Sequence, residues 1–179
     1  MHPLSQCWPR PDSLAGLDRL VARARVCWHG SMRFTLETVA SPDQALRAFT
    51  DFSERRLQTW SRTLDPRRYE LREHGDTWAI VREASPGSPF WVVCHYDWSQ
   101  PGEVRWDVVE SSYGGGGSGV IRVEPLESGG SRVHAEWDAT GGQRGQRALI
   151  FLLYNGPIPR LLPRVWRGAL DRYAASGGT

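Results

Sequence analysis

The chain has 179 residues, which is enough for one domain with a sizeable core and too few for two. Hydrophobic residues make up 40% and charged residues 23%, as in ordinary globular proteins. The net charge is only +2, and acidic residues are interleaved with the basic ones along the chain, so no basic stripe for a nucleic acid is expected. All 22 basic residues are arginine, which excludes a Schiff-base lysine and the lysine of a phosphate-binding loop.

Residues 1–31 differ in pattern from the rest of the chain. A proline-broken start, MHPLSQCWPRP, precedes residues 12–26, in which leucines recur at helical spacing. Met32 stands at the start of the first clear strand. We interpret residues 1–31 as an N-terminal extension, either disordered or a loosely docked helix. The domain is then expected over residues 32–175, with a tail over residues 176–179.

The domain is predicted to open with a strand and two helices. Residues 32–39, MRFTLETV, alternate between apolar and polar and so predict a strand. Ser41, Pro42 and Gln44 form an S-x-x-Q capping box with proline at the first helical position, which predicts a helix start. A second short helix is expected over residues 53–60.

Six further strands are predicted from alternation of period two, with glycine- and proline-rich turns between them. They are expected near residues 69–73, 77–83, 90–98, 104–112, 119–124 and 132–140. Consecutive strands joined by short turns predict an antiparallel meander. An apolar stripe at helical spacing then predicts a C-terminal helix; its members are Leu161, Leu162, Val165, Trp166, Ala169, Leu170 and Tyr173.

The glycine run SSYGGGGSG, residues 111–119, satisfies the G-x-G-x-x-G spacing of a dinucleotide-binding loop. That motif requires a helix after it, because the pyrophosphate sits on the helix N-terminus. Here the next predicted element is a strand, and the run contains no basic residue. We therefore predict a hairpin loop, and a flexible flap at a cavity mouth is its functional version.

The order of elements resembles the helix-grip fold of the START-like superfamily, which includes bacterial polyketide cyclases and plant Bet v 1-type binders. The resemblance covers residues 32–175 and rests on the segments VASPDQALRAFTDF, WVVCHYDWSQPGEVRWDVVES, RVHAEWDAT and RVWRGALDRYA. It implies an α+β fold in which a curved antiparallel sheet of about seven strands wraps around the C-terminal helix. It also implies a deep apolar cavity, which some members use for cyclisation and others for binding lipids.

Two residues are candidates for acid–base catalysis. Trp106 and Val108 alternate with Arg105 and Asp107, so regular alternation places Glu110 on the inward apolar face, where desolvation would raise its pKa. His95 is the second candidate, because histidine is the side chain most often used as a general acid or base. Either face of residues 90–98 is apolar enough to be inside: one choice buries Trp91, Val93 and His95, and the other buries Phe90, Val92, Cys94, Tyr96 and Trp98.

Seven further residues are candidates for ligand binding, because they are aromatic or polar and fall on the central strands or near the last helix. They are Arg82, Tyr96, Trp78, Trp106, Trp137, Tyr154 and Arg164. An aromatic cage could form from Trp60, Trp78, Trp106 and Trp137, but we expect these residues to belong to an ordinary core.

The remaining composition limits cofactors and partners. Cys7, Cys27 and Cys94 are far apart and are expected to be free thiols in a reducing cytoplasm. The five histidines lack metal-ligand spacing, and no apolar run is long enough to span a membrane. We expect no cofactor and no metal, and a monomer or homodimer. The first expected function is binding of a hydrophobic small molecule; a cofactor-free cyclase and a protein-interaction module are the alternatives, so enzymatic activity stays open.

Overall fold

The computed structural model describes residues 29–142, 146, 151, 154, 156 and 158–177. Within these residues, eight strands form one antiparallel sheet: β1 (His29–Thr38), β2 (Glu70–His74), β3 (Trp78–Glu83), β4 (Val92–Asp97), β5 (Glu103–Ser111), β6 (Gly115–Gly116), β7 (Ser118–Pro125) and β8 (Ser131–Gly141). The helices α1 (Pro42–Thr50), α2 (Arg55–Thr59) and α4 (Ile158–Ala175) accompany it. The predicted α+β architecture is confirmed.

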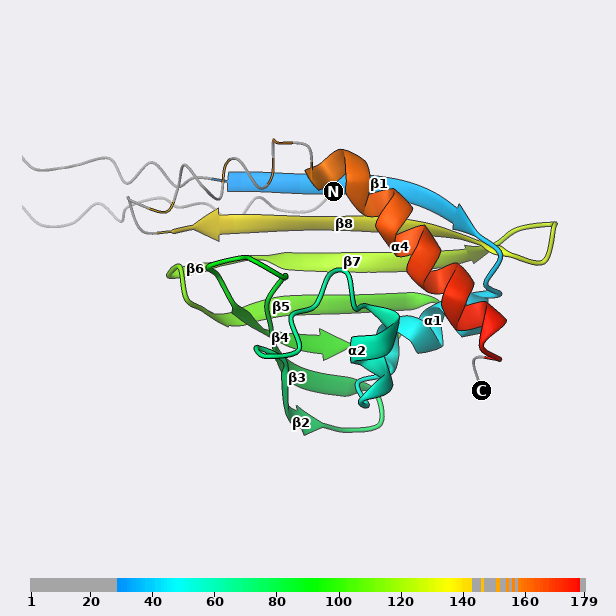
Figure 1. The fold of residues 1–179 in the computed structure, drawn as a ribbon, viewed down its shortest axis with the longest axis horizontal. Coiled ribbons are helices and arrows are strands. Elements are labelled where there is room, and N and C mark those ends of the chain that lie inside the picture. Colours follow the sequence, from blue (N-terminus) through cyan, green and yellow to red (C-terminus); the bar gives the residue numbers. More distant parts are fainter. Residues whose placement is uncertain are drawn as a thin grey trace, which may run out of the picture.

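The sheet is a meander, and the first strand of the chain is added at its edge beside the last strand. Its order is β1-β8-β7-β5-β4-β3-β2, and β6 pairs with β8 off this path. β1 runs antiparallel to β8 along its whole length, from His29 opposite Thr140 to Thr38 opposite Ser131. The two strands that are farthest apart in sequence therefore lie side by side, as Figure 1 shows.

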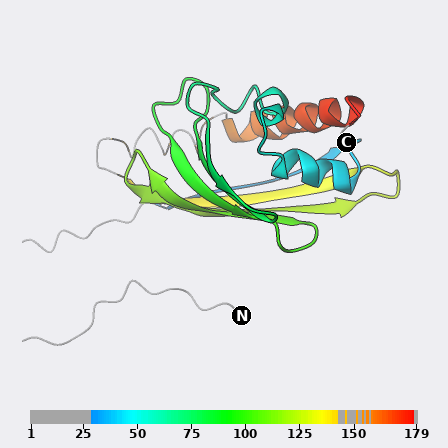
Figure 2. The same cartoon turned by 90° about the horizontal axis from the view of Figure 1, so that it is seen from below.

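The helices cover one face of the curved sheet, which Figure 2 shows edge-on. α4 crosses this face beside β1 and α1 (Figure 1). Its buried residues Ala169, Leu170 and Tyr173 pack into the main core, where Leu36 and Val133 from the sheet meet them. The predicted apolar stripe of this helix thus faces the sheet at its C-terminal half, because burial of that surface drives the packing.

Two polar contacts fix the helices in place. The Asp171 carboxylate on α4 accepts hydrogen bonds from the Thr38 hydroxyl at 2.5 Å and the Val39 N–H at 3.1 Å, just past the end of β1. At the start of α1, the capping box is present in both directions between Ser41 and Gln44, as predicted. These contacts satisfy backbone groups that would otherwise be unpaired where β1 gives way to α1.

The glycine run is a hairpin connection, as predicted, but it is folded against β8. Gly115 and Gly116 form β6 and pair with Gly141 and Thr140. A Cβ on Gly115 would lie 2.2 Å from the Thr140 carbonyl oxygen, so only glycine permits this approach. Tyr113, in the same connection, is buried. The connection therefore packs against this end of the sheet.

The predicted N-terminal extension lies outside the described residues except for residues 29–31, which belong to β1. The predicted tail is described as far as Gly177. Residues 29–31 are therefore part of the sheet and not of the extension, and we propose the extension for residues 1–28 alone.

Truncation tests this proposal. A chain that begins at His29 is expected to keep the Tm of the full chain within about 2 °C. A chain that begins at Met32 should melt at a lower temperature, because it loses the pairs that residues 29–31 make with β8. Differential scanning calorimetry checks both. A large fall in Tm for the chain that begins at His29 would show instead that residues 1–28 dock on the domain.

Candidate functional site

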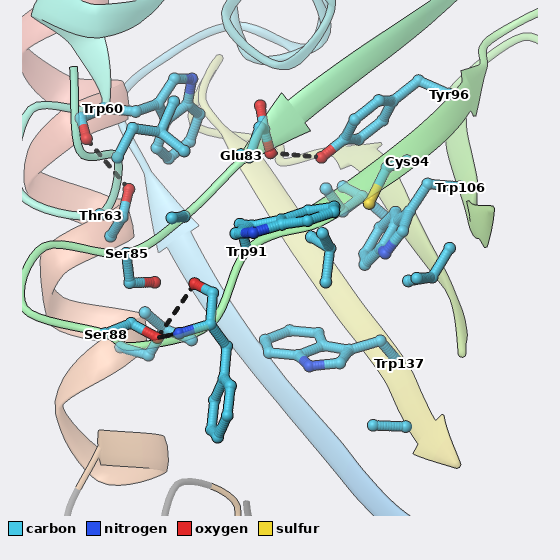
Figure 3. A pocket seen from close by; sticks show the side chains of 18 of the residues that line it. Trp60, Thr63, Glu83, Ser85, Ser88, Trp91, Cys94, Tyr96, Trp106 and Trp137 are labelled. Atoms are coloured by element: carbon cyan, nitrogen blue, oxygen red, sulfur yellow. Dashed lines mark hydrogen bonds between the residues drawn. The ribbon is translucent and has the colours of Figure 1, made fainter. Parts of the chain in front are cut away.

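A cavity of about 360 Å³ lies between the sheet, α4 and the segment that carries α2. Its walls are largely apolar, and five tryptophans line it: Trp60, Trp91, Trp106, Trp137 and Trp166. Figure 3 shows Trp91 near the middle of this space, together with Trp106 of β5 and Trp137 of β8, two strands that β7 separates. Such walls offer flat apolar surfaces with an N–H group at their edges.

Sheet register places two of these tryptophans on one row. Trp106 on β5 and Trp137 on β8 both lie opposite Gly119 on β7. A Cβ on Gly119 would lie 2.1 Å from the Trp106 ring, so the missing side chain gives this ring its place. Trp137 in turn stacks on Trp166 of α4, with ring centroids 6.1 Å apart. The aromatic surface is therefore continuous from the sheet to the helix.

A buried charged cluster forms one polar part of the cavity wall. The Arg56 Nε of α2 donates to the Glu83 carboxylate of β3 at 2.8 Å, and the Tyr96 hydroxyl of β4 donates to its other oxygen at 2.8 Å. The second of these bonds is drawn in Figure 3. Arg56 Nη1 also donates to the Phe49 carbonyl at 3.0 Å. Arg56 and Glu83 are only 6% and 8% exposed, and all three side chains line the cavity.

The surroundings fix the protonation of this cluster. Burial alone would lower the pKa of Arg56, but the Glu83 carboxylate and two nearby tyrosines raise it overall, so the guanidinium stays charged. Burial, followed by the negative charge of Glu83, raises the pKa of Tyr96 well above its ordinary value. Tyr96 is therefore a neutral hydrogen-bond donor at neutral pH.

Other groups at the cavity wall are also held neutral. Burial is the main cause that raises the pKa of the Cys94 thiol, and it raises the pKa of Tyr113 and Tyr154 as well. A thiol must ionise to attack a substrate, so Cys94 is unreactive in this setting.

Four of the seven predicted ligand-binding residues line the cavity. They are Tyr96, Trp106, Trp137 and Tyr154. The first three lie on β4, β5 and β8, whose inward faces they share with Cys94, Val108 and Ala139.

The other three lie outside the cavity lining. Trp78 stacks on the ring of His95, with centroids 5.9 Å apart. The Arg82 guanidinium lies 4.4 Å above the Trp91 ring, and its enclosed Nε makes no hydrogen bond with the described residues. Arg164 is exposed on α4.

Glu110 does not face inward, and that expectation is wrong. Cys94 lies opposite Val108, but Val93 lies opposite Glu110, so Val109 is an extra residue in β5. This β-bulge ends the regular alternation on which the expectation rested. The Glu110 side chain is 52% exposed, outside the cavity lining, and pairs with Arg72 at 3.0 Å.

The residues that line the cavity show which face of residues 90–98 points inward. Val92, Cys94 and Tyr96 line the cavity, so His95 between them points to the opposite face. Its cross-strand neighbours are Ile80 and Asp107. A His95–Glu110 pair inside the cavity is therefore not formed.

Arg56 and Glu83 were not predicted from the sequence, although both carry a signal there. Ala79, Val81 and Glu83 share one face of β3 by simple alternation, which places a carboxylate in line with two buried residues. Phe52, Arg56 and Trp60 recur at intervals of four, so in the sequence the guanidinium stands at helical spacing between two aromatic residues.

The buried ion pair predicts a stability effect. Arg56→Met should lower the free energy of unfolding by about 3 kcal/mol, because Glu83 would stay buried without a charged partner. Arg132→Met is the matched control: Arg132 also contacts a carboxylate, Glu37, at 2.8 Å, but these side chains are 42% and 55% exposed. The control should cost less than about 1 kcal/mol. Urea unfolding measures both, and equal losses would contradict the role given to burial.

Alkaline pH should destabilise the fold. Burial raises the pKa of Tyr69 from 10.0 to about 12 and also raises the pKa of Tyr96 well above 10.0, so at pH above 10 the unfolded chain binds fewer protons than the folded one. The free energy of unfolding must then fall as pH rises. Urea midpoints across this range are expected to decrease, and Tyr96→Phe should make the decrease shallower. An unchanged slope in this variant would contradict the assignment.

No protein-family model and no curated protein matches the sequence, but solved structures share its fold. The Zhui aromatase/cyclase from Streptomyces sp. R1128 has a TM-score of 0.64 at 14% identity, over 84% of this chain and 99% of its own. Norcoclaurine synthase from Thalictrum flavum has a TM-score of 0.62 at 12% identity, over 93% and 99%. A START superfamily protein from Mycobacterium smegmatis has a TM-score of 0.63 at 10% identity, over 80% and 98%.

Sequence identities of 10–14% show a shared fold and do not show a shared activity.

In the described part of the chain, no helix has the length and apolar character needed to cross a membrane. The antiparallel sheet, the C-terminal helix and the solved structures agree: the chain has the helix-grip fold of the START-like superfamily.

Proposed function

We propose that this protein binds a hydrophobic, aromatic small molecule in the cavity between the sheet and α4. The observation that carries the proposal is the cavity itself, about 360 Å³ in volume and lined by five tryptophans. Small-molecule sites in proteins commonly have volumes of about 300–1,000 Å³ and mostly apolar walls with a few polar groups. The cavity has both properties.

The wall chemistry favours a flat, aromatic occupant. Trp106, Trp137 and Trp166 present ring surfaces that an aromatic ligand can meet in offset or edge-to-face contact. Backbone groups along the sheet are paired in the strand ladders, so the wall between the tryptophans offers few polar partners. Burial of apolar ligand surface supplies most of the binding free energy in such a site.

A cofactor-free cyclase-type activity is the second candidate. The observation that favours it is the convergence of Arg56, Glu83 and Tyr96 on the same cavity. The charged guanidinium of Arg56 can polarise a carbonyl and stabilise an enolate, and the Glu83 carboxylate beside it can accept a proton. Aromatase/cyclase and norcoclaurine synthase structures with the same fold are consistent with chemistry in such a cavity.

Side chains do not fill the cavity, which favours either role over a protein-interaction module, because such a module would have a filled core.

As part of the same proposal, the protein acts in a reducing cytoplasm as a monomer or homodimer, without nucleic acid. The free, buried thiol of Cys94 supports the reducing compartment.

Native mass spectrometry of protein purified from its own host would identify a retained molecule directly.

Filling the cavity tests the binding proposal. Val108 lines the cavity, whereas its neighbour Val109 is 56% exposed on the other face. Val108→Phe should weaken binding of phenylnaphthylamine, an uncharged aromatic probe that fluoresces in apolar surroundings, by at least about tenfold, the loss of one well-buried apolar contact. Val109→Phe makes the same substitution one residue away and should leave the affinity unchanged. Fluorescence titration measures both.

Two results would contradict this proposal. One is an absence of probe binding to the unaltered protein, and the other is equal affinity in both variants. Far-ultraviolet circular dichroism and the Tm of each variant control for loss of the fold.

A further inference from the structure

The charged cluster in the cavity wall points to one class of ligand group. We propose that Arg56, Glu83 and Tyr96 form a subsite for an uncharged oxygen of the ligand, a hydroxyl or a carbonyl, and that this subsite discriminates against carboxylates. The inference rests on the proposed binding function and deepens it. It concerns which aromatic molecules are accepted, and it holds whether the bound molecule is released unchanged or converted.

The hydrogen-bonding capacity of the cluster is only partly used. Among the described residues, Arg56 donates through Nε and Nη1, so further N–H donors of its five remain. Each Glu83 oxygen accepts one bond, one from Arg56 and one from Tyr96, and each can accept another. None of the nitrogen or oxygen atoms of these three side chains is both enclosed and unpartnered. A hydroxyl, which donates and accepts, matches this set.

The charge of the cluster selects against ions. Arg56 and Glu83 compensate each other at 2.8 Å and are almost fully buried, so their sum is near zero. A ligand carboxylate would add a second negative charge beside Glu83 with only one guanidinium present, and an unpaired buried charge is costly. A ligand ammonium would face the same problem beside Arg56. An uncharged polar group avoids both costs.

Another acid borders the cavity without changing this balance. Asp138 on β8 accepts the Ser118 N–H at 2.9 Å in an exposed contact, so its carboxylate is engaged on the outer side of the strand. Its neighbours Trp137 and Ala139 line the cavity with their side chains, as alternation along a strand requires.

Three two-ring probes of similar size test the subsite by isothermal titration calorimetry at neutral pH. Naphthalene has no polar group, 2-naphthol has a hydroxyl that is uncharged at this pH, and 2-naphthoate is an anion. For the unaltered protein, we expect 2-naphthol to bind about tenfold more tightly than naphthalene, the effect of one hydrogen bond to a charged group. We expect 2-naphthoate to bind the least tightly of the three.

Two variants then separate charge from polarity. Glu83→Gln leaves the Arg56 charge uncompensated, so 2-naphthoate should become the tightest-binding probe. The triple variant Arg56→Met/Glu83→Leu/Tyr96→Phe replaces the whole cluster by apolar side chains, which a fold often tolerates better than half of an ion pair. In this variant, 2-naphthol and naphthalene should bind within about twofold of each other, because no hydrogen bond distinguishes them. The triple variant keeps the test decisive where Glu83→Gln does not fold.

The control changes an ion pair outside the cavity. Arg132→Met/Glu37→Leu removes a pair with the same 2.8 Å contact between exposed side chains of β8 and β1, and it should retain the preference for 2-naphthol. Equal binding of naphthalene and 2-naphthol to the unaltered protein would overturn the subsite and leave the binding function intact. Tightest binding of 2-naphthoate to the unaltered protein would do the same. Failure of all three probes to bind would overturn the binding function itself.

Discussion

The buried ion pair between Arg56 and Glu83 joins the parts of the structure that enclose the cavity. α2 has five residues, too few to be stable as an isolated helix. Its Arg56 side chain reaches β3 through Glu83 and the end of α1 through the Phe49 carbonyl. Trp60, at the end of α2, donates from Nε1 to the Ala48 carbonyl of α1 at 2.9 Å. Three elements are thus held together where the cavity wall needs them.

This arrangement gives the cavity its mixed chemistry. Apolar side chains of similar volume would hold α2 to the sheet at least as well, because a buried ion pair rarely adds net stability over such a replacement. The pair instead places two charges and the Tyr96 hydroxyl beside aromatic walls. Arg56 also lies over the Phe52 ring, with its guanidinium carbon 4.1 Å from the centroid, so the cluster merges with the aromatic packing around it.

Much of the fold could be predicted from local pattern, and the cavity could be predicted only in part. Alternation and turn residues placed the strands, and the Ser41 capping box placed α1, because these signals are local. Both faces of residues 90–98 are apolar, so only pairing with β3 and β5 decides that Cys94 points inward. Trp60 and Trp166 come together through the packing of α4, which no short segment encodes.

The bulge at Val109 matters as much for the charge of the cavity as for the shape of β5. In regular alternation, Glu110 would share the inward face of Trp106 and Val108 and add a second carboxylate to a site with one guanidinium. The extra residue instead turns Glu110 outward, where Arg72 compensates it in contact with solvent. Two adjacent valines give no sequence signal for this shift, because either can be the unpaired residue. One inserted residue in a strand thus leaves Glu83 and Arg56 as a balanced pair, and that balance is what permits the aromatic cavity to hold charged groups at all.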